Sequence, residues 1–215
     1  MMRGRDIVLE LPDSRSRVKL PSFLSWNNFG MIHWSDAKTE PSYEERQIGR
    51  HPATGEVFWT KRCKVVDRVG LDLGPSREAD ASAAPVPYAV DPTIEDFERI
   101  DAAGEFSDQN MEAHFRTRFW WRANDPQRSG GGRAVAEARF RQNLDRLLSL
   151  TPRETPGRDW LEIEIAREVG DFERARRLLN KLPSSREGLI TRCFRRWLAE
   201  NNAKVGVVAP ESQAV

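Results

Sequence analysis

Residues 160–183 read W-L-E-I-E-I-A-R-E-V-G-D-F-E-R-A-R-R-L-L-N-K-L-P, and this stretch decides the fold of the C-terminal half of the chain. Apolar side chains recur at helical spacing on both sides of Gly170. They are Trp160, Ile163, Ala166 and Val169 before it, and Phe172, Ala175, Leu178, Leu179 and Leu182 after it. The pattern predicts a pair of short helices over residues 159–182, folded back on each other at Gly170. Such a pair is a unit of packing or binding and carries no chemistry of its own.

The turn of this helix pair resembles the helix-turn-helix junction of a tetratricopeptide repeat. Gly170 permits a sharp turn, Asp171 caps the following helix, and the small Ala175 lets the two helices approach closely. A repeat of this family implies a peptide-binding groove. However, Ile163 stands where the first helix of such a repeat usually has a small residue, and no second copy follows at a period of about 34 residues. The alternative is an ordinary helical hairpin that closes a small bundle.

Helical periodicity fills most of residues 91–202. Asp91-Pro92-Thr93 predicts the start of a helix that Gly104 ends. Besides the helix pair, three further helices are predicted, near residues 108–124, 133–150 and 185–201. We expect Asn124-Asp125-Pro126 to end the first of these three. From Ala203 onward the periodicity stops, so residues 203–215 are predicted to be a disordered tail.

The N-terminal third predicts a small antiparallel β unit over residues 1–70. Short runs rich in β-branched and aromatic residues alternate there with turn signals. Residues 71–90 are rich in Pro, Ala and Ser and predict a linker or a strap over the surface. The expected fold class is therefore α+β, with a β unit at 1–70, a connection at 71–90 and a helical domain at 91–202.

A second resemblance lies in the β unit. Residues 26–38 read W-N-N-F-G-M-I-H-W-S-D-A-K, and residues 51–59 read H-P-A-T-G-E-V-F-W. These stretches resemble a group of uncharacterised bacterial proteins that have a zinc-ribbon head and a tetratricopeptide-like helical end. The places of that group's two cysteine pairs are taken here by Leu11-Pro12-Asp13-Ser14 and His51-Pro52-Ala53-Thr54. Because a structural zinc needs four nitrogen or sulfur ligands, the resemblance implies a degenerate, metal-free zinc ribbon. The group has no activity that transfers to this chain.

Several classes of protein do not fit the composition. No apolar stretch approaches the roughly 18 residues of a membrane span. The apolar patch near the N-terminus already contains Asp6 and Glu10, which does not fit a signal peptide. Cys63 and Cys193 lie far apart in the sequence and predict two reduced thiols rather than a disulfide. We therefore expect a cytoplasmic protein that has no membrane partner.

Charged residues are nearly balanced, with 34 basic and 33 acidic side chains. The positive and negative charges are interleaved almost throughout the sequence, unlike the segregated basic face of a nucleic-acid-binding protein.

The densest group of Arg and aromatic residues is R-T-R-F-W-W-R-A-N-D-P-Q-R at 116–128. One interpretation is a site that stacks a base or binds an anion. Its candidate binding residues are Arg118, Trp121, Arg122, Asn124 and Arg128. The alternative is that Trp120 or Trp121 fills the core while guanidinium groups pair with Glu105 or Glu112.

Catalytic motifs of known enzyme classes do not occur in the sequence. His33 and Asp36 lie in one turn region and come nearest to an acid–base pair, although a surface histidine is the commoner outcome. We expect no catalytic residue, no cofactor and no metal ion. The sequence favours a non-enzymatic interaction or adaptor protein that binds an unidentified protein through its helical, tetratricopeptide-like region or its 116–128 surface. A nucleic-acid-binding protein using Arg/Trp-rich faces is the alternative, and an enzyme with a dispersed site is a third class.

Overall fold

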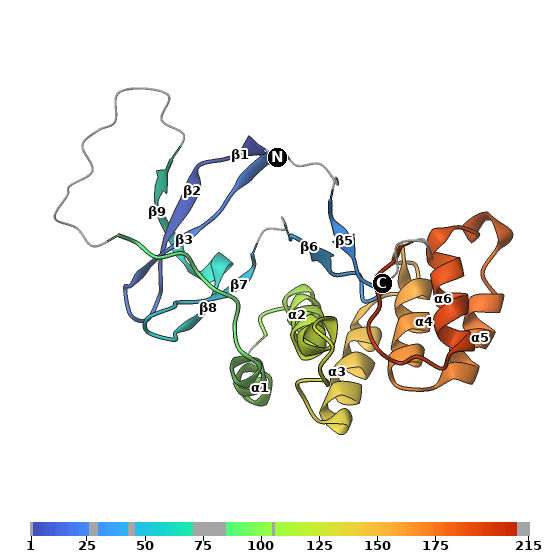
Figure 1. The fold of residues 1–215 in the computed structure, drawn as a ribbon. Helices are drawn as coiled ribbons and strands as arrows, with labels where there is room; N and C mark the ends of the chain where they lie inside the picture. The colour runs from blue at the N-terminus through green and yellow to red at the C-terminus, as the bar shows by residue number, and fades with distance from the viewer. Residues whose placement is uncertain (1, 26–29, 43–45, 71–84, 105, 210–215) are drawn as a thin grey trace. The chain divides into compact units, whose positions relative to one another are not determined.

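The computed structural model describes residues 2–25, 30–42, 46–70, 85–104 and 106–209 (Figure 1). Antiparallel strands come first in the chain and six α-helices follow in its described part, so the fold class is α+β, as predicted. The chain divides into two compact units. Unit 1 consists of Met1–Phe29 and Tyr43–Arg99, and unit 2 of Gly30–Ser42 and Ile100–Val215.

Unit 1 is built on a three-stranded antiparallel sheet in which β2 lies between β3 and β9. Two antiparallel pairs accompany it, β1 with β4 and β7 with β8. The strands are β1 (Met2–Arg3), β2 (Asp6–Glu10), β3 (Arg17–Leu20), β4 (Phe23–Ser25), β7 (Ile48–Arg50), β8 (Val57–Trp59) and β9 (Lys64–Val69), with a 3-10 turn η1 (Thr60–Arg62) before β9. Leu9, Val18 and Phe58 lie in one buried apolar cluster, because period-2 alternation turns these side chains inward.

Two turns of unit 1 occupy the positions at which the zinc-ribbon resemblance would place metal ligands. Leu11 is fully buried and belongs to the apolar core. His51 is also buried, and its Nδ1 accepts hydrogen bonds from the backbone N–H groups of Ala53 and Thr54 at 3.2 and 3.1 Å. The imidazole therefore closes its own turn, which satisfies two backbone donors that would otherwise be unpaired.

The connection predicted at 71–90 is partly described. Residues 71–84 lie outside the described residues, whereas residues 87–90 pair with two strands of unit 1. The N–H of Ala89 donates to the carbonyl of Lys19 at 2.9 Å, and Arg50 and Val90 exchange two backbone hydrogen bonds. Ala89 is buried. This end of the connection is therefore part of the β structure.

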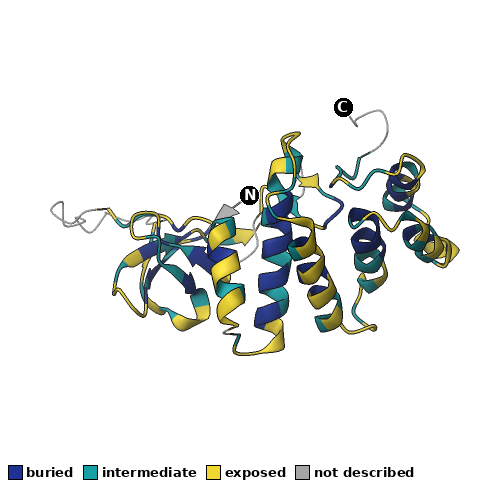
Figure 2. Ribbon diagram, turned by 90° about the horizontal axis from the view of Figure 1, so that it is seen from below, coloured by how far each residue is buried: buried dark blue, intermediate teal, exposed yellow. Residues whose placement is uncertain are grey.

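Unit 2 contains a short hairpin of β5 (Ile32–His33) and β6 (Thr39–Glu40) and the helices that follow. The helices of the chain are α1 (Ile94–Ala103), within which the division between the units falls, α2 (Gln109–Arg128), α3 (Glu137–Leu150), α4 (Arg158–Glu168), α5 (Phe172–Asn180) and α6 (Leu189–Ala199), with a 3-10 turn η2 (Ser184–Arg186) before α6. Buried residues line much of α2 (Figure 2). Among the described residues, none of the helices has the length and apolar character that a membrane span requires.

Helix α2 extends beyond its predicted end at residue 124. Pro126 lies within its last turn, where the missing N–H costs only one intrahelical bond. The carbonyl of Pro126 accepts from the N–H groups of Ser129 and Gly131 at 3.2 and 2.8 Å, so the chain stays helical to Arg128 before it turns. The prediction that Asn124-Asp125-Pro126 stops the helix was wrong for this reason.

The predicted helix pair is present as α4 and α5. Gly170 adopts a left-handed conformation with φ +79°, and the Asp171 carboxylate accepts from the N–H of Arg174 at 3.0 Å. Ala175 is fully buried where the two helices meet. Ile163, Ala175 and Phe194 belong to one apolar cluster that α4, α5 and α6 share.

Two boundaries of the predicted domains differ from the structure. Residues 30–42 group with the helical unit rather than with the β unit, because Ser35 and Asp36 are buried against helices. Residues 203–209, predicted to be disordered, are ordered against the helices and the β5–β6 hairpin, and Val205 is buried. Polar backbone pairing holds this segment, and apolar periodicity cannot reveal such pairing. Residues 210–215 lie outside the described residues.

Candidate functional site

Helix α4 buries two different faces, and the polar one organises the candidate site. Its apolar face carries Ile163 and Ala166 into the cluster shared with α5 and α6. Glu164, Arg167 and Glu168, spaced i, i+3 and i+4, lie on another face and are each no more than 2% exposed. Burial of three charged side chains on one helix requires partners, because an uncompensated buried charge is very costly.

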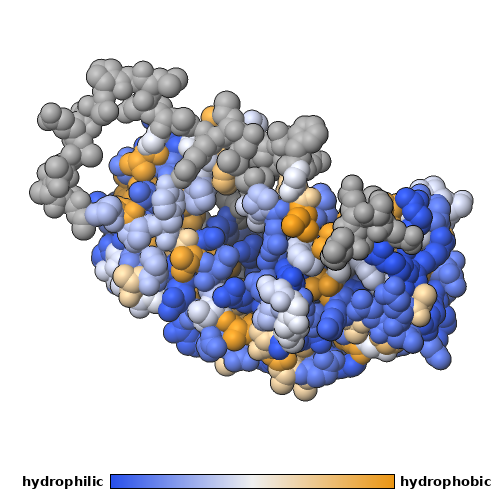
Figure 3. Space-filling model, in the orientation of Figure 1, coloured by the Kyte–Doolittle hydropathy of each residue, from blue (hydrophilic) through white to orange (hydrophobic). Residues whose placement is uncertain are grey.

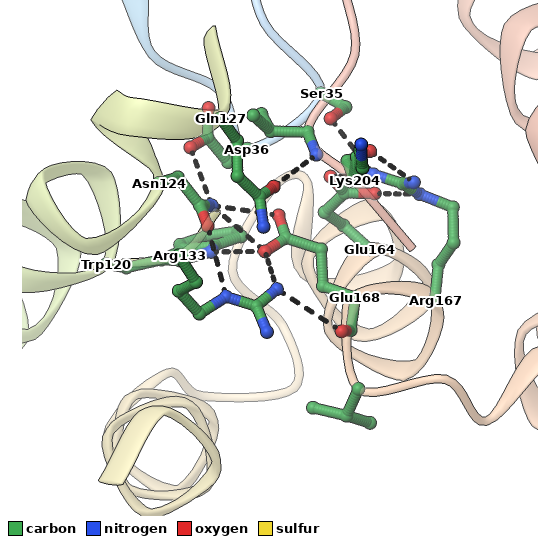
Figure 4. Close-up of polar contacts among 12 residues, drawn as sticks. Ser35, Asp36, Trp120, Asn124, Gln127, Arg133, Glu164, Arg167, Glu168 and Lys204 are labelled. Atoms are coloured by element: carbon green, nitrogen blue, oxygen red, sulfur yellow. Dashed lines mark hydrogen bonds and ion pairs between the residues drawn. The ribbon is translucent and has the colours of Figure 1, made fainter. Parts of the chain in front are cut away.

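Asp36 lies in the turn between β5 and β6, and its contacts with α2 form the first part of the network (Figure 4). The Arg128 guanidinium donates to its carboxylate at 2.6 Å, and the Asn124 amide donates to the same oxygen at 3.2 Å. The Trp121 indole N–H donates to the backbone carbonyl of Asp36 at 2.8 Å, and the N–H of Lys38 donates to the other carboxylate oxygen at 3.3 Å. Helix α2 therefore fixes both the side chain and the backbone of this turn.

Glu168 lies on the other side of Asn124. The amide of Asn124 donates to Glu168 Oε2 at 2.9 Å, so a single side chain joins the carboxylates of Asp36 and Glu168. The indole N–H of Trp120 donates to Glu168 Oε2 at 3.2 Å, and the Arg133 guanidinium lies 3.5 Å from that oxygen. Asn124 is fully buried, so both carboxylates meet it away from solvent.

Arg167 is the most heavily used cation of the network. Its guanidinium makes a bidentate pair with Glu164, at 2.7 Å from Nε and 2.6 Å from Nη2. Nη1 donates to the carbonyls of Asn202 and Lys204, and Nη2 donates to the Ser35 hydroxyl at 3.1 Å. The planar fork of Arg suits this arrangement, which a Lys could not reproduce. Through Arg167, helix α4 holds both the hairpin and residues 202–204.

The network balances three carboxylates with three guanidinium groups, which are Asp36, Glu164 and Glu168 against Arg128, Arg133 and Arg167. Burial nevertheless raises the pKa of Asp36 to about 6, although Arg128 and Asn124 oppose the rise. Burial, followed by the nearby charges of Glu164 and Asp36, raises the pKa of Glu168 well above its usual value. Burial lowers the pKa of Arg167, but the ion pair with Glu164 and the charges of Glu168 and Asp36 together raise that pKa overall.

The geometry of this network suits a structural role better than a reaction. The side chains of Asp36 and Glu168 are 0% exposed and that of Glu164 is 1% exposed, so no carboxylate oxygen is open to a substrate. In the part of the chain that the structure describes, no group of three His, Cys, Asp or Glu side chains is arranged to hold a metal ion. The network joins α2, α4, the β5–β6 turn and the residues after α6.

Three of the five binding residues predicted from the sequence, Trp121, Asn124 and Arg128, converge on Asp36 inside the network. The other two do not. The guanidinium of Arg118 lies 5.3 Å from the Trp121 ring, and Arg122 pairs with Asp125 at 3.3 Å.

Both tryptophans of the 116–128 segment are buried, at 3% exposed for Trp120 and 7% for Trp121. This agrees with the alternative in which tryptophan fills the core. Arg116 pairs with Glu112 at 3.2 Å, as that alternative requires, while Glu105 lies outside the described residues. The side chains of this segment are therefore largely engaged inside unit 2.

His33 and Asp36 do not form an acid–base pair. His33 is exposed and its backbone carbonyl accepts from Val208, whereas Asp36 is 1% exposed and faces α2 and α4. The two cysteines are free, and Cys193 is buried. Burial, with a smaller effect of Glu56, raises the pKa of Cys63 to about 11, which keeps that thiol protonated and unreactive near neutral pH.

Sequence reasoning missed the other members of the network, which are Ser35, Arg133, Glu164, Arg167 and Glu168. A signal was present in W-L-E-I-E-I-A-R-E, where charged residues at 164, 167 and 168 repeat at helical spacing. Helical polar stripes normally face solvent. The sequence does not show that the β5–β6 hairpin and the residues after α6 cover the polar stripe of Glu164, Arg167 and Glu168.

Comparison of the chain with protein-family models, with curated proteins and with solved structures finds no significant match.

Proposed function

We propose that this chain is a non-enzymatic protein-binding or adaptor protein, and that its docking surface lies at the turn between α5 and α6. Residues 171–196 contain eight basic and three acidic side chains, a net charge of +5, whereas the whole chain carries only +1. Charge is therefore segregated onto this part of unit 2 although the overall composition is balanced. The surface where α5 and α6 lie is largely hydrophilic (Figure 3).

Three cations at this turn have no internal role in the described part of the chain. Lys181 at the end of α5, Arg186 in η2 and Arg192 in the first turn of α6 are exposed, and none of their side chains forms an ion pair or hydrogen bond there. Arg192 also lies at the positive end of the α6 dipole, where a cation is unfavourable for folding. We call these three residues the cationic turn. Their free charges support a role in recognising an anionic partner.

An acidic segment of another protein fits the cationic turn better than nucleic acid does. Leu182, Leu189 and Ile190 lie among the three cations and are only partly buried, so the surface offers apolar contact beside positive charge. An amphipathic helix with acidic and aliphatic residues matches that combination. Trp120, Trp121 and Trp197 are all buried, so they do not provide the exposed stacking platforms on which single-stranded nucleic acid binds.

Fluorescence anisotropy tests this proposal with a labelled amphipathic peptide, in which Leu residues form one face of the helix and Glu residues form the other. We expect saturable binding that weakens as salt increases, and at least a tenfold loss of affinity in Lys181→Glu/Arg186→Glu/Arg192→Glu. The matched control Arg62→Glu/Lys64→Glu/Arg68→Glu changes the net charge equally, at exposed positions of unit 1, and should bind like the wild type.

Two outcomes would contradict the proposal. Equal losses in both triple variants would mean that the peptide responds to net charge and not to the cationic turn. Tighter binding of a labelled oligonucleotide than of the peptide, lost in the first variant alone, would assign the surface to nucleic acid instead.

A further inference from the structure

The segment Asn202–Ala209, which we call the strap, pairs with residues 33–35 through its backbone. Its Gly206 carbonyl accepts from the N–H of Ser35 at 2.8 Å, and the N–H of Val208 donates to the carbonyl of His33 at 2.8 Å. Trp34 and Val207 form an antiparallel bridge between these two bonds. Main-chain pairing of this kind holds a peptide by its backbone and is independent of most side chains.

Side chains of the helices complete the place in which the strap lies. Arg167 donates to two strap carbonyls, those of Asn202 and Lys204. Gln127 Oε1 accepts from the N–H of Val205 at 3.1 Å, and the Ser35 hydroxyl accepts from the N–H of Gly206 at 3.0 Å. We call the residues that contact the strap the seat, and they are His33, Trp34, Ser35, Gln127, Arg167, Cys193 and Trp197.

The seat requires glycine at position 206 of the segment that it binds. A Cβ atom at this position would lie 2.7 Å from Cζ2 of Trp197, closer than real Cβ contacts allow. Trp197 is held by neighbours on two sides, because its ring packs edge-on against Phe194 at 5.4 Å and the Arg167 guanidinium lies 5.1 Å from its centroid. On either side of the glycine, Val205 is buried and Val208 packs on the apolar cluster of α4, α5 and α6. The seat therefore selects an extended segment with the order aliphatic, Gly, any residue, aliphatic.

Two features of the strap favour its release from the seat. It joins α6 through Asn201, which has φ +49° and is one of the few residues other than glycine in the left-handed region. It is a segment of eight residues with a bend at Lys204, held by backbone hydrogen bonds, by Arg167 and by the apolar contacts of Val205 and Val208. Segments of this kind open locally at less free energy than global unfolding requires.

We propose that the seat is a binding site for an extended peptide of a partner protein with this aliphatic-Gly-x-aliphatic order, and that the strap is the internal ligand which such a peptide displaces. The inference rests on the proposed protein-binding function but not on the cationic turn, which lies on different residues. An internal ligand competes at an effective concentration on the order of millimolar. Binding from outside is therefore weak until the strap is released.

The test releases the strap in the full chain and supplies its sequence as a separate peptide. The probe is the fluorescein-labelled peptide N-A-K-V-G-V-V-A, which repeats residues 202–209, and the matched control peptide replaces its glycine with valine. The Gly206→Val chain should bind the probe at least tenfold more tightly than the wild type does, and it should not bind the control peptide. A second release variant, Val208→Asp, should behave in the same way.

A folded release variant that ignores the probe, or that binds both peptides equally, would overturn the proposal. Hydrogen exchange on the wild-type chain gives an independent check if both variants unfold. The amides of Gly206 and Val208 should exchange faster than those of the α4 core, and exchange only through global unfolding would overturn the proposal as well. The cationic-turn triple variant, combined with Gly206→Val, should still bind the probe. This result would separate a failure of the seat from a failure of the cationic turn. A stable dimer of the wild-type chain that the probe dissociates would show that the strap of a second copy, and not a partner, fills the seat.

Discussion

The two buried faces of α4 pack against different kinds of neighbour. Toward α5 and α6 the contact is apolar and centred on Ile163, Ala175 and Phe194. Toward α2 and the β5–β6 turn it is ionic and centred on Asp36, Glu168 and Asn124. We call the first contact the apolar seam and the second the ionic seam.

The seams differ in what they contribute to the fold. Burial of apolar area stabilises the apolar seam by roughly 25 cal/mol per Å² and tolerates small shifts of the partners. The ionic seam gains little net free energy, because desolvation offsets much of the attraction between its charges. Its hydrogen bonds are directional, however, and they set the position of the β5–β6 turn and the position of the strap while the strap occupies the seat. The difference indicates that the ionic seam specifies position more than it supplies stability.

The largest expected effect comes from breaking one ion pair of the ionic seam. Arg167→Met leaves Glu164 buried at 1% exposure without its bidentate partner, and it leaves the carbonyls of Asn202 and Lys204 without their donor. We expect a loss of about 3–5 kcal/mol in the free energy of unfolding, measured by urea denaturation.

The double variant Glu164→Gln/Arg167→Met tests the reason for that loss. Because it removes the uncompensated charge, it should be more stable than Arg167→Met alone, with a coupling energy of at least about 1 kcal/mol. Strictly additive losses in the two single variants would show that the pair is not a unit.

The same contrast explains which features could be predicted from the sequence. Ile163 and Ala175 follow helical periodicity, and Gly170 and Asp171 have familiar roles in turns, so the α4–α5 pair was predicted from local pattern alone. Besides Glu164, the partners of Arg167 lie 35, 37 and 132 residues away along the chain. No local pattern encodes such distant contacts. Asp36 was noticed only as a neighbour of His33, although its carboxylate meets α2 and not the histidine.

A smaller effect is expected from titration of the ionic seam. The pKa of Asp36 rises from 3.8 to about 6, so the folded chain retains a proton that the unfolded chain has lost between these values. The contribution of this group to stability therefore increases as pH falls through 6 and decreases as pH rises. Between pH 7 and pH 5 the gain is about 1.3 kcal/mol. Glu168 contributes with the same sign, because its pKa is also raised.

Titration of His114 lowers the stability of the folded chain on acidification, which opposes the effect of Asp36, so His114 is replaced in the variants that are compared. Burial, with help from Arg118, lowers its pKa to about 4, so the folded chain resists a proton that the unfolded chain accepts below about pH 6.5. We therefore compare His114→Gln with His114→Gln/Asp36→Asn by urea denaturation at pH 7, 6 and 5. The chain with Asp36 should gain stability relative to its partner on acidification. Parallel pH profiles would mean that Asp36 does not titrate in this window.

The smallest effect belongs to the apolar seam. Ile163→Val removes one methylene group from a fully buried side chain among α4, α5 and α6, and should cost about 1 kcal/mol. No titratable group takes part in that packing change, so the loss should be the same at pH 5 and pH 7, unlike the loss in Asp36→Asn. Urea midpoints at both pH values measure it. A loss that varied with pH would show that the two faces of α4 are coupled, and the ionic seam would then contribute to the packing of the bundle as well as to the position of the strap.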